Sequence, residues 1–260
     1  MDIDFILEKT FQYKIWNNQP VFCFTSDIDW ASEAVLEYYF EIINTYELKP
    51  TLFITHRSKI VERNYFAGKI ETGIHPNFLP DSSQGKTYEE VIKSCLNCCP
   101  GKPVQFRCHR AYDVTDITHL LRNEYGFTHY SNYITLMQPN VRPIIHESGL
   151  INFPVFFEDG TYLYNKFPLK FNEWFFSTPG IKVISIHPMH LVMNSPDFKF
   201  MRKLKDTLGR EKYQNISEIE IKKYKQEQGI ADMILDMIRW IRQSGFPVCS
   251  LNEIYQIFLK

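Results

Sequence analysis

Short runs of β-branched and aromatic residues alternate along the chain with longer segments in which apolar residues recur every three or four positions. The short apolar runs predict strands, and the longer periodic segments predict amphipathic helices. Eight strands are expected, over residues 21–25, 51–55, 69–74, 104–108, 127–131, 151–156, 181–186 and 246–249.

Helices are expected over residues 32–46, 87–96, 113–125 and 230–244. Ser32 can cap the first of these, and Gly245 can close the last. Strands that alternate with helices are typical of a parallel sheet. About eight such strands in one chain of this length favour a closed or nearly closed (β/α) barrel. We therefore expect an α/β fold in a single domain spanning residues 1–260.

One segment, at about residues 196–228, interrupts the alternation. It is dense in charge, as in "KFMRKLKDTLGREKYQ" and "EIEIKKYKQEQ", and it has helical periodicity. One interpretation is a solvated helical insertion on the outside of the barrel. The other is a lid over a binding pocket, because insertions after strand ends surround the active sites of barrel enzymes.

Composition narrows the class of protein. Of 260 residues, 44% are hydrophobic and 15% aromatic, which describes a folded globular protein with a sizeable core. The net charge of -1 indicates neither a nucleic-acid partner nor a membrane-surface partner. The first residues lack the features of a signal peptide, and no segment is long and apolar enough to span a membrane, so a cytoplasmic protein is expected.

The six cysteines do not predict a metal site of their own. "CLNCC", residues 95–99, resembles half of a zinc site, but no second Cys or Cys/His pair follows at a suitable spacing. We expect reduced thiols, most of them buried.

Polar, titratable residues follow several of the predicted strands, where a parallel barrel places its active site. They are Ser26, Asp27 and Asp29; His75 and Asn77; Arg107, His109, Arg110 and Tyr112; Glu158 and Asp159; and His187 and His190. Each motif alone has an ordinary explanation, such as a turn or a satisfied histidine at a strand end. Together, aspartate and histidine are the ligands of zinc or another divalent transition metal, and a cation would also offset the repulsion between clustered carboxylates. His56 and His119 are poor candidates because one begins a predicted helix and the other lies within one.

In order along the chain, "TSDIDW", "GIHPNF", "FRCHR" and "SIHPMH" resemble the motifs of metal-dependent polysaccharide deacetylases of the carbohydrate-esterase type. The resemblance covers residues 21–194. It implies a distorted barrel of seven or eight β/α units. It also implies a hydrolase that removes an acetyl group from an N-acetylated sugar, with a divalent metal, expected to be zinc, as cofactor. Without a signal peptide, a sugar precursor of surface polysaccharide biosynthesis is the expected substrate.

The resemblance also implies roles for individual residues. Asp27 matches the catalytic base and Asp29 a metal ligand, although Ile28 separates them here and the two roles could be exchanged. His75 matches the first histidine of the second motif, but Leu79 stands where the family has its second histidine. We expect His109 to replace it as the third ligand.

Arg107 matches the arginine that orients the base, and His187 matches the general acid. His190 or Asp159 is expected to steady His187. The expected substrate-binding residues are Trp30, Asn77, Arg110, Tyr112, Asp159 and His190, with Phe78 as a further wall.

Two other functions remain open on the sequence alone. One is hydrolysis of a different C–N amide bond on the same barrel. The other is a carbohydrate-binding protein that has lost the metal and does not catalyse a reaction.

Overall fold

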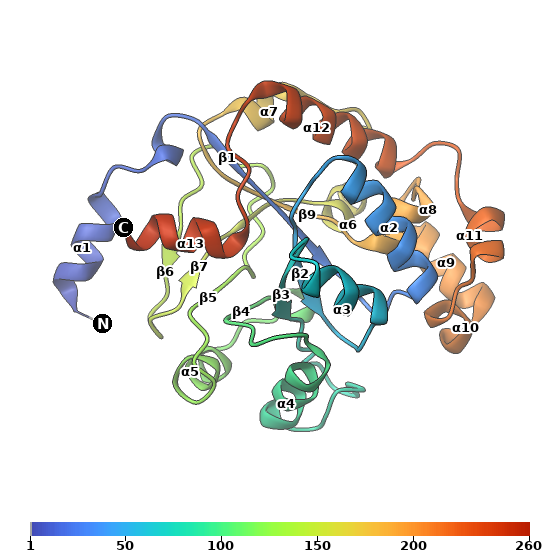
Figure 1. Cartoon of the computed structure of the whole chain (residues 1–260), viewed down its shortest axis with the longest axis horizontal. Helices are drawn as coiled ribbons and strands as arrows, with labels where there is room; N and C mark the ends of the chain where they lie inside the picture. The colour runs from blue at the N-terminus through green and yellow to red at the C-terminus, as the bar shows by residue number, and fades with distance from the viewer. Residues whose placement is uncertain (1) are drawn as a thin grey trace.

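A single, strongly curled sheet with helices around its outside organises the molecule, as seen in the computed structural model, which describes residues 2–260 (Figure 1). Nine strands pair in the order β6-β7-β5-β4-β3-β2-β1-β9-β8. All neighbours are parallel except β6 and β7, which are antiparallel. The strands are β1 (Pro20–Asp27), β2 (Thr51–Ile54), β3 (Glu71–Ile74), β4 (Gln105–Phe106), β5 (His129–Tyr130), β6 (Ile144–Ile145), β7 (Ile151–Asn152), β8 (Val155–Glu158) and β9 (Gly180–Ser185).

Most strands are followed by at least one helix, and two 3-10 turns, η1 (Ile15–Asn17) and η2 (His109–Ala111), complete the order. The helices are α1 (Ile3–Phe11), α2 (Glu33–Thr45), α3 (Lys59–Phe66), α4 (Tyr88–Cys98), α5 (Thr115–Asn123), α6 (Asp159–Tyr164), α7 (Glu173–Ser177), α8 (Pro188–Met193), α9 (Phe198–Leu208), α10 (Arg210–Gln214), α11 (Glu218–Tyr224), α12 (Ile230–Ser244) and α13 (Leu251–Leu259).

The predicted α/β fold with a distorted barrel is confirmed, and its distortion lies between the two edge strands. The edges, β6 and β8, do not pair with each other. Instead the loop of residues 133–137 bonds to β8: the Val155 N–H donates to the Tyr133 carbonyl (2.7 Å), and the Thr135 N–H donates to the Val155 carbonyl (2.9 Å). The sheet is therefore a half-barrel whose open side is bridged by a loop.

Two strand predictions need correction, and each of the two segments contains a proline. The strand expected over 151–156 is two strands, β7 and β8, separated at Pro154, which has no N–H to donate to a ladder. The segment 246–249 is not a strand. It makes one bridge beside β1, where the Phe22 N–H donates to the Pro247 carbonyl (2.9 Å) and the Cys249 N–H donates to the Phe22 carbonyl (2.8 Å).

Helix boundaries follow their predicted caps more closely. The Ser32 hydroxyl accepts a hydrogen bond from the Val35 N–H (3.2 Å) and starts α2. The predicted helix over 230–244 coincides with α12, and Gly245 ends it with a φ of 72°, a left-handed conformation that glycine adopts without strain.

Strand β1 lies between β2 and β9 in the sheet, and all eight of its residues are buried. Its side chains alternate between two apolar clusters, as the pleat of a strand requires. Phe22 and Phe24 pack in the cluster under the outer helices, whereas Val21 and Cys23 pack in the cluster inside the curled sheet.

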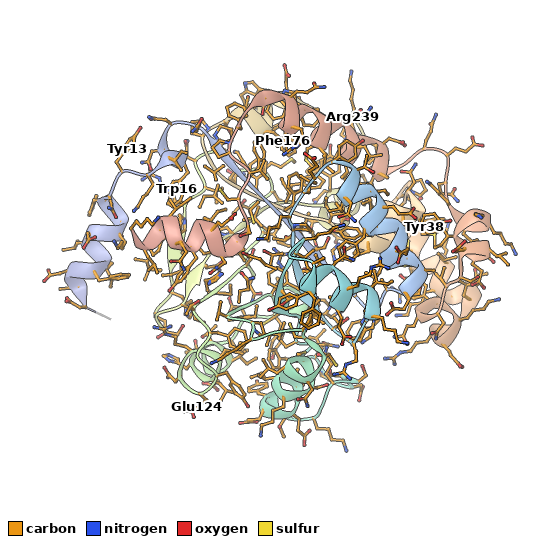
Figure 2. The ribbon with its side chains drawn as sticks, in the orientation of Figure 1. Tyr13, Trp16, Tyr38, Glu124, Phe176 and Arg239 are labelled. Atoms are coloured by element: carbon orange, nitrogen blue, oxygen red, sulfur yellow. The ribbon has the colours of Figure 1, made fainter. Side chains whose placement is uncertain are left out.

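Helix α13 and Trp16 close the inner cluster on the side where β1 and β9 begin. Glu71 of β3 holds this helix in place: its carboxylate accepts hydrogen bonds from the Ser250 hydroxyl (2.6 Å) and the Asn252 N–H (3.3 Å). In Figure 2, Trp16 is surrounded by other side chains, whereas Tyr13 extends outward. The carboxyl ends of the strands stay free to form a site.

The charged segment predicted at about 196–228 forms α9, α10 and α11. Its apolar side chains Met201, Leu204, Ile216 and Ile221 are buried, and most of its charged side chains face solvent. Helix α9 contacts α6, and α11 contacts α2 and α8. The segment therefore packs along the outside of the sheet, beside the helices that follow β1, β8 and β9.

All six cysteines are free thiols, and four of them are buried. None of the helices within residues 2–260 combines the length and the apolar character needed to cross a bilayer.

Candidate metal centre and active-site cavity

A cavity of about 400 Å³ opens at the carboxyl ends of the strands. Its volume falls in the range of small-molecule sites. Chemically active side chains from five strand ends line it: Asp27 at the end of β1 and Asp29 after it, His75 after β3, Arg107 and His109 after β4, Glu158 at the end of β8, and His187 and His190 after β9.

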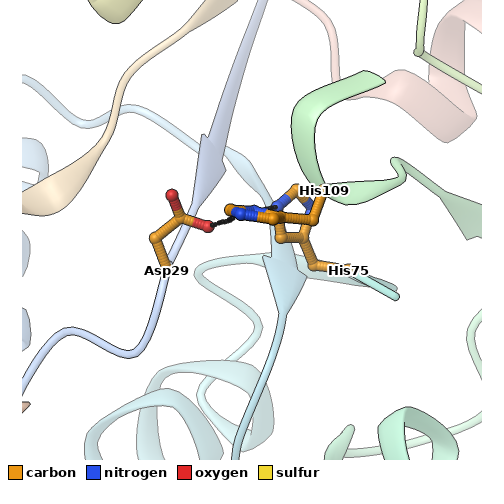
Figure 3. Close-up of side chains that lie close together, drawn as sticks. All are labelled: Asp29, His75 and His109. Carbon is orange, nitrogen blue, oxygen red and sulfur yellow. Dashed lines mark hydrogen bonds and ion pairs between the residues drawn. The ribbon is translucent and has the colours of Figure 1, made fainter. Parts of the chain in front are cut away.

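Three of these side chains direct one ligand atom each toward a common point (Figure 3). Asp29 Oδ1 lies 3.2 Å from His75 Nε2 and 3.2 Å from His109 Nδ1. The two histidine nitrogens lie 3.3 Å apart. The atoms thus form a nearly equilateral triangle.

The dimensions of this triangle fit a transition metal. Two ligand atoms bonded at about 2.0–2.1 Å to a tetrahedral zinc lie about 3.3 Å apart. Asp29 Oδ1 is buried and has no hydrogen-bond partner in residues 2–260, as expected for an oxygen that binds a cation. One carboxylate and two imidazoles, with a side open to the cavity, are also the donor set of a catalytic zinc.

The ligand triangle also keeps Asp29 ionised. Burial alone would raise the pKa of Asp29, but the contacts with His109 and His75 outweigh it and lower that pKa well below its usual value. A carboxylate must be deprotonated to bind a metal.

A sharp turn of the backbone after β1 aims Asp29 into the cavity. Asp29 and Trp30 have φ values of 40° and 57°, in the left-handed region that non-glycine residues avoid. Hydrogen bonds hold the turn: the Trp30 N–H donates to the Thr55 hydroxyl (3.1 Å), and the Ala31 N–H donates to the Ile28 carbonyl (2.7 Å). Backbone strain of this kind is common at ligand sites.

A second left-handed turn follows β4 and presents His109. Arg110 and Ala111 have φ values of 57° and 52°. The His109 N–H donates to the Pro76 carbonyl (2.9 Å), which ties this turn to the segment that carries His75. Two histidines 34 positions apart in the sequence are thereby fixed next to each other.

Asp27 faces the cavity but contacts an arginine instead of the ligand triangle. Arg107 donates a hydrogen bond to Asp27 Oδ1 (2.9 Å), and both side chains are buried. The rest of the guanidinium is fixed by Thr25, Ser185 and Ser131, so that Arg107 makes five hydrogen bonds in all. A carboxylate held this way stays oriented, and one of its oxygens can still face a reactant.

His187 faces the same centre from β9. Its Nε2 lies 3.7 Å from Asp29 Oδ2 and 3.9 Å from Asp27 Oδ2, and its Nδ1 is bonded to Asp159 Oδ1 at 2.5 Å. Burial would lower the pKa of His187, but Asp159 and the charges of Asp29 and Asp27 outweigh it and raise that pKa well above its usual value. The site therefore favours a protonated imidazole that points Nε2–H into the cavity.

Asp159 is fully buried at the start of α6 and also accepts the His187 backbone N–H (2.7 Å). Burial would raise its pKa, but the charge of His187 and the hydrogen bonds to it lower the pKa below its usual value. It steadies His187, and no part of it is accessible to a substrate.

His190 lines the cavity beside His187, and its Nδ1 is bonded to the Ser195 hydroxyl (2.9 Å). Burial lowers the pKa of His190, which favours the neutral ring. Glu158 caps α6 through the Thr161 N–H (2.9 Å), and burial raises its pKa.

The structure does not bring all the predicted substrate-binding residues to the cavity. Arg110 and His190 line it, but Trp30, Asn77 and Tyr112 do not. The Trp30 ring instead packs edge-on against His109, at 5.5 Å between ring centroids. The Asn77 side chain accepts the Leu79 N–H (3.2 Å) in a turn, and Tyr112 packs against Phe78.

Two aromatic residues that were not predicted from the sequence, Tyr164 and Phe198, line the cavity. Tyr164 ends α6, and Phe198 begins α9, the first helix of the charged segment. The sequence could have indicated Phe198, because this residue lies near the start of the charged segment that follows the last histidine motif. Insertions at such positions surround the active sites of barrel enzymes.

Comparison with known proteins agrees with this geometry. The family model "WbmS-like: Polysaccharide deacetylase" matches residues 24–205. No curated protein matches the chain.

Two of the solved structures that match this chain share its fold over most of their length. One, from Bordetella bronchiseptica, is described as a polysaccharide deacetylase involved in O-antigen biosynthesis. It is 23% identical, has a TM-score of 0.73, and covers 84% of this chain and 89% of its own. The other, described as a polysaccharide deacetylase from Mycobacterium smegmatis, is 12% identical, with a TM-score of 0.58 over 92% of this chain and 90% of its own. Because the family match extends over more than half of the chain, the protein belongs to the WbmS-like polysaccharide deacetylase family.

Proposed function

We propose that this protein is a zinc-dependent deacetylase that removes the acetyl group from an N-acetylated sugar during assembly of a surface polysaccharide. The observation that carries the proposal is the triangle of Asp29, His75 and His109 beside two further pairs, Asp27–Arg107 and His187–Asp159, in one cavity. The Bordetella bronchiseptica structure, described as involved in O-antigen biosynthesis, supports the choice of pathway.

Asp29, His75 and His109 would hold the ion. A zinc ion there would polarise the acetamide carbonyl and lower the pKa of a water from about 15.7 toward 7. His109 would take the place of the histidine that Leu79 cannot supply.

Asp27 would act as the general base and take the proton of the attacking water. Its buried hydrogen bond with Arg107 leaves Asp27 Oδ2 directed toward the centre, 3.9 Å from His187 Nε2. Because Asp29 contacts both histidines and Asp27 contacts neither His75 nor His109, the geometry favours Asp27 as the base and Asp29 as the ligand over the reverse.

His187 would deliver the proton to the departing nitrogen. Its Nε2 faces the cavity, and its Nδ1–H is held by Asp159, which fixes both the ring orientation and the protonated state. The products would be acetate and a free amino sugar.

The test is acetate release from a panel of N-acetylated sugars, including nucleotide-linked ones, by the zinc-loaded protein. In Asp27→Asn we expect the rate to fall by about 10²–10⁴-fold while the zinc content stays the same. Asp116→Asn, an exposed carboxylate on α5, is the matched control and should leave both unchanged.

Three results would contradict the proposal. Full turnover in Asp27→Asn would rule out the base assignment. Release of ammonia or amine from small amides, with none from acetylated sugars, would indicate a different C–N hydrolase. Sugar binding without zinc binding or hydrolysis would indicate a non-catalytic carbohydrate-binding protein.

A further inference from the structure

The cavity extends from the candidate metal centre to two exposed aromatic side chains, Tyr164 and Phe198. Their ring centroids lie 5.1 Å apart, with the planes at 78°. They are 65% and 49% exposed, and among residues 2–260 they are the only large, exposed apolar side chains that line this cavity.

An exposed aromatic pair in a binding cavity suits a sugar ring. Aromatic rings combine a large apolar face with little conformational freedom, and the C–H faces of a sugar can pack against them while the sugar hydroxyls stay in water. The two rings come from different elements, the end of α6 and the start of α9, and α6 and α9 are in contact. The pair is therefore part of the packed structure.

Arg110 is the second feature of the cavity, after the aromatic pair, that has no role in the proposed reaction. Its guanidinium forms no ion pair or side-chain hydrogen bond within residues 2–260, whereas the nearby Arg107 is fully engaged. Arg110 lies in the left-handed turn directly after His109, and both side chains line the cavity. A free guanidinium in a binding cavity is suited to a carboxylate or a phosphate, which it can bind through two parallel hydrogen bonds.

We propose that Tyr164, Phe198 and Arg110 form an outer subsite, and that the substrate is an anionic saccharide larger than a single N-acetylated sugar. This inference rests on the proposed function only in placing the acetylated sugar at the metal centre. The aromatic pair packs against the sugar ring next to the acetylated one. Arg110 binds the negative group, which is either the carboxylate of an acidic sugar or the phosphate of an activated one.

Binding measurements on the zinc-loaded protein, by titration calorimetry, test this without requiring turnover. Four probes separate the features: N-acetylglucosamine, N,N′-diacetylchitobiose, N-acetylglucosamine 1-phosphate, and the disaccharide of glucuronic acid and N-acetylglucosamine. We expect the second ring to tighten binding by up to about tenfold, and at least one anionic probe to bind about tenfold more tightly than the neutral probe of the same size. The anionic probe that gains affinity identifies the source of the charge.

Variants assign each gain to its residue. Tyr164→Ala and Phe198→Ser should remove the advantage of the second ring and leave N-acetylglucosamine unaffected. Arg110→Gln should remove only the advantage of the anionic probe. Phe66→Ala and Arg202→Gln, which change an exposed aromatic and an exposed arginine outside the cavity, should behave like the unaltered protein.

The subsite is ruled out if all four probes bind equally, if none binds, or if the cavity variants match their controls. The proposed function is judged separately by acetate release. A protein that shows the expected binding pattern but no hydrolysis would keep the subsite and lose the deacetylase assignment.

Discussion

Single residues in rare backbone conformations give the site its shape. Asp29 and Trp30 in one turn, and Arg110 and Ala111 in the other, adopt left-handed conformations. Each costs roughly 1–2 kcal/mol for an L-residue, so the surrounding contacts must offset this strain. The hydrogen bonds around the two turns do so, and they hold the loops that carry Asp29 and His109 in place.

Asp159 allows a sharp test at this scale, because it touches His187 and no substrate. In Asp159→Asn the carboxylate that orients and charges His187 is lost, while the shape of the side chain is kept. We expect acetate release to slow by about 10²–10⁴-fold, with zinc content unchanged. Wild-type rates in this variant would show that His187 does not act as the acid.

At the scale of elements, the charged segment supports the loop that carries Asp29. The Ser32 hydroxyl, besides capping α2, donates a hydrogen bond to the carbonyl of Ile216, between α10 and α11 (2.6 Å). Tyr213 of α10 lies near Asp29: burial raises the pKa of Tyr213, and the charge of Asp29 raises it further. The segment thus packs beside the loop that carries the candidate ligand Asp29, and its Phe198 lines the cavity.

Two serine caps test this support. Ser32 and Ser58 each cap a helix with the same 3.2 Å hydrogen bond, but only Ser32 also bonds to the charged segment. Replacing Ser58 with alanine should lower the free energy of unfolding by about 1 kcal/mol, measured in urea. Ser32→Ala should lower it by more, because the Ile216 carbonyl also loses its donor. Only Ser32→Ala should also weaken zinc binding, by several-fold. Equal zinc affinities in the two variants would contradict the supporting role.

Helices with a clear apolar periodicity and cap could be predicted from the sequence. The lengths of short strands, which depend on pairing with a neighbouring strand, could not. Helix α12 has a clear apolar stripe and a terminal Gly245, and its bounds match the prediction. Strands β4 to β7 have two residues each, because the distorted sheet pairs only briefly there. No local pattern reports how long a neighbouring strand stays within hydrogen-bonding distance.

The site was predictable to the same extent. The strand-end rule directs attention to Asp29, His75 and His109, and the structure places them together. It does not tell which aromatic residues face the cavity, since that depends on how loops turn after the strand. Trp30 therefore packs against His109 outside the cavity, whereas Tyr164 and Phe198 line it.

At the scale of the whole molecule, a buried histidine links stability to pH. His129 lies inside the curled sheet, hydrogen-bonded to Gln105 (2.8 Å) and stacked on Tyr255 of α13 (4.5 Å between centroids). Burial lowers its pKa to about 3. In the unfolded chain His129 takes up a proton near pH 6.5, but in the folded protein it does not. The contribution of neutral His129 to stability is therefore fully present above pH 6.5 and is lost as the pH falls toward 3.

Because of this residue, we expect the free energy of unfolding to fall by up to about 1.4 kcal/mol for each pH unit below 6.5. Urea unfolding at several pH values, compared with His129→Gln, measures it, and the variant should show a flatter dependence. His119→Gln, which changes an exposed histidine, is the control. Identical pH dependences for the unaltered protein and His129→Gln would refute this.

Three side chains from separate strand ends, Asp29, His75 and His109, are proposed to hold one zinc ion. Crystals soaked in zinc and measured at the zinc absorption edge test it directly. We expect a single strong anomalous peak within about 2.0–2.2 Å of Asp29 Oδ1, His75 Nε2 and His109 Nδ1. A peak elsewhere, or one that His109 does not touch, would contradict it.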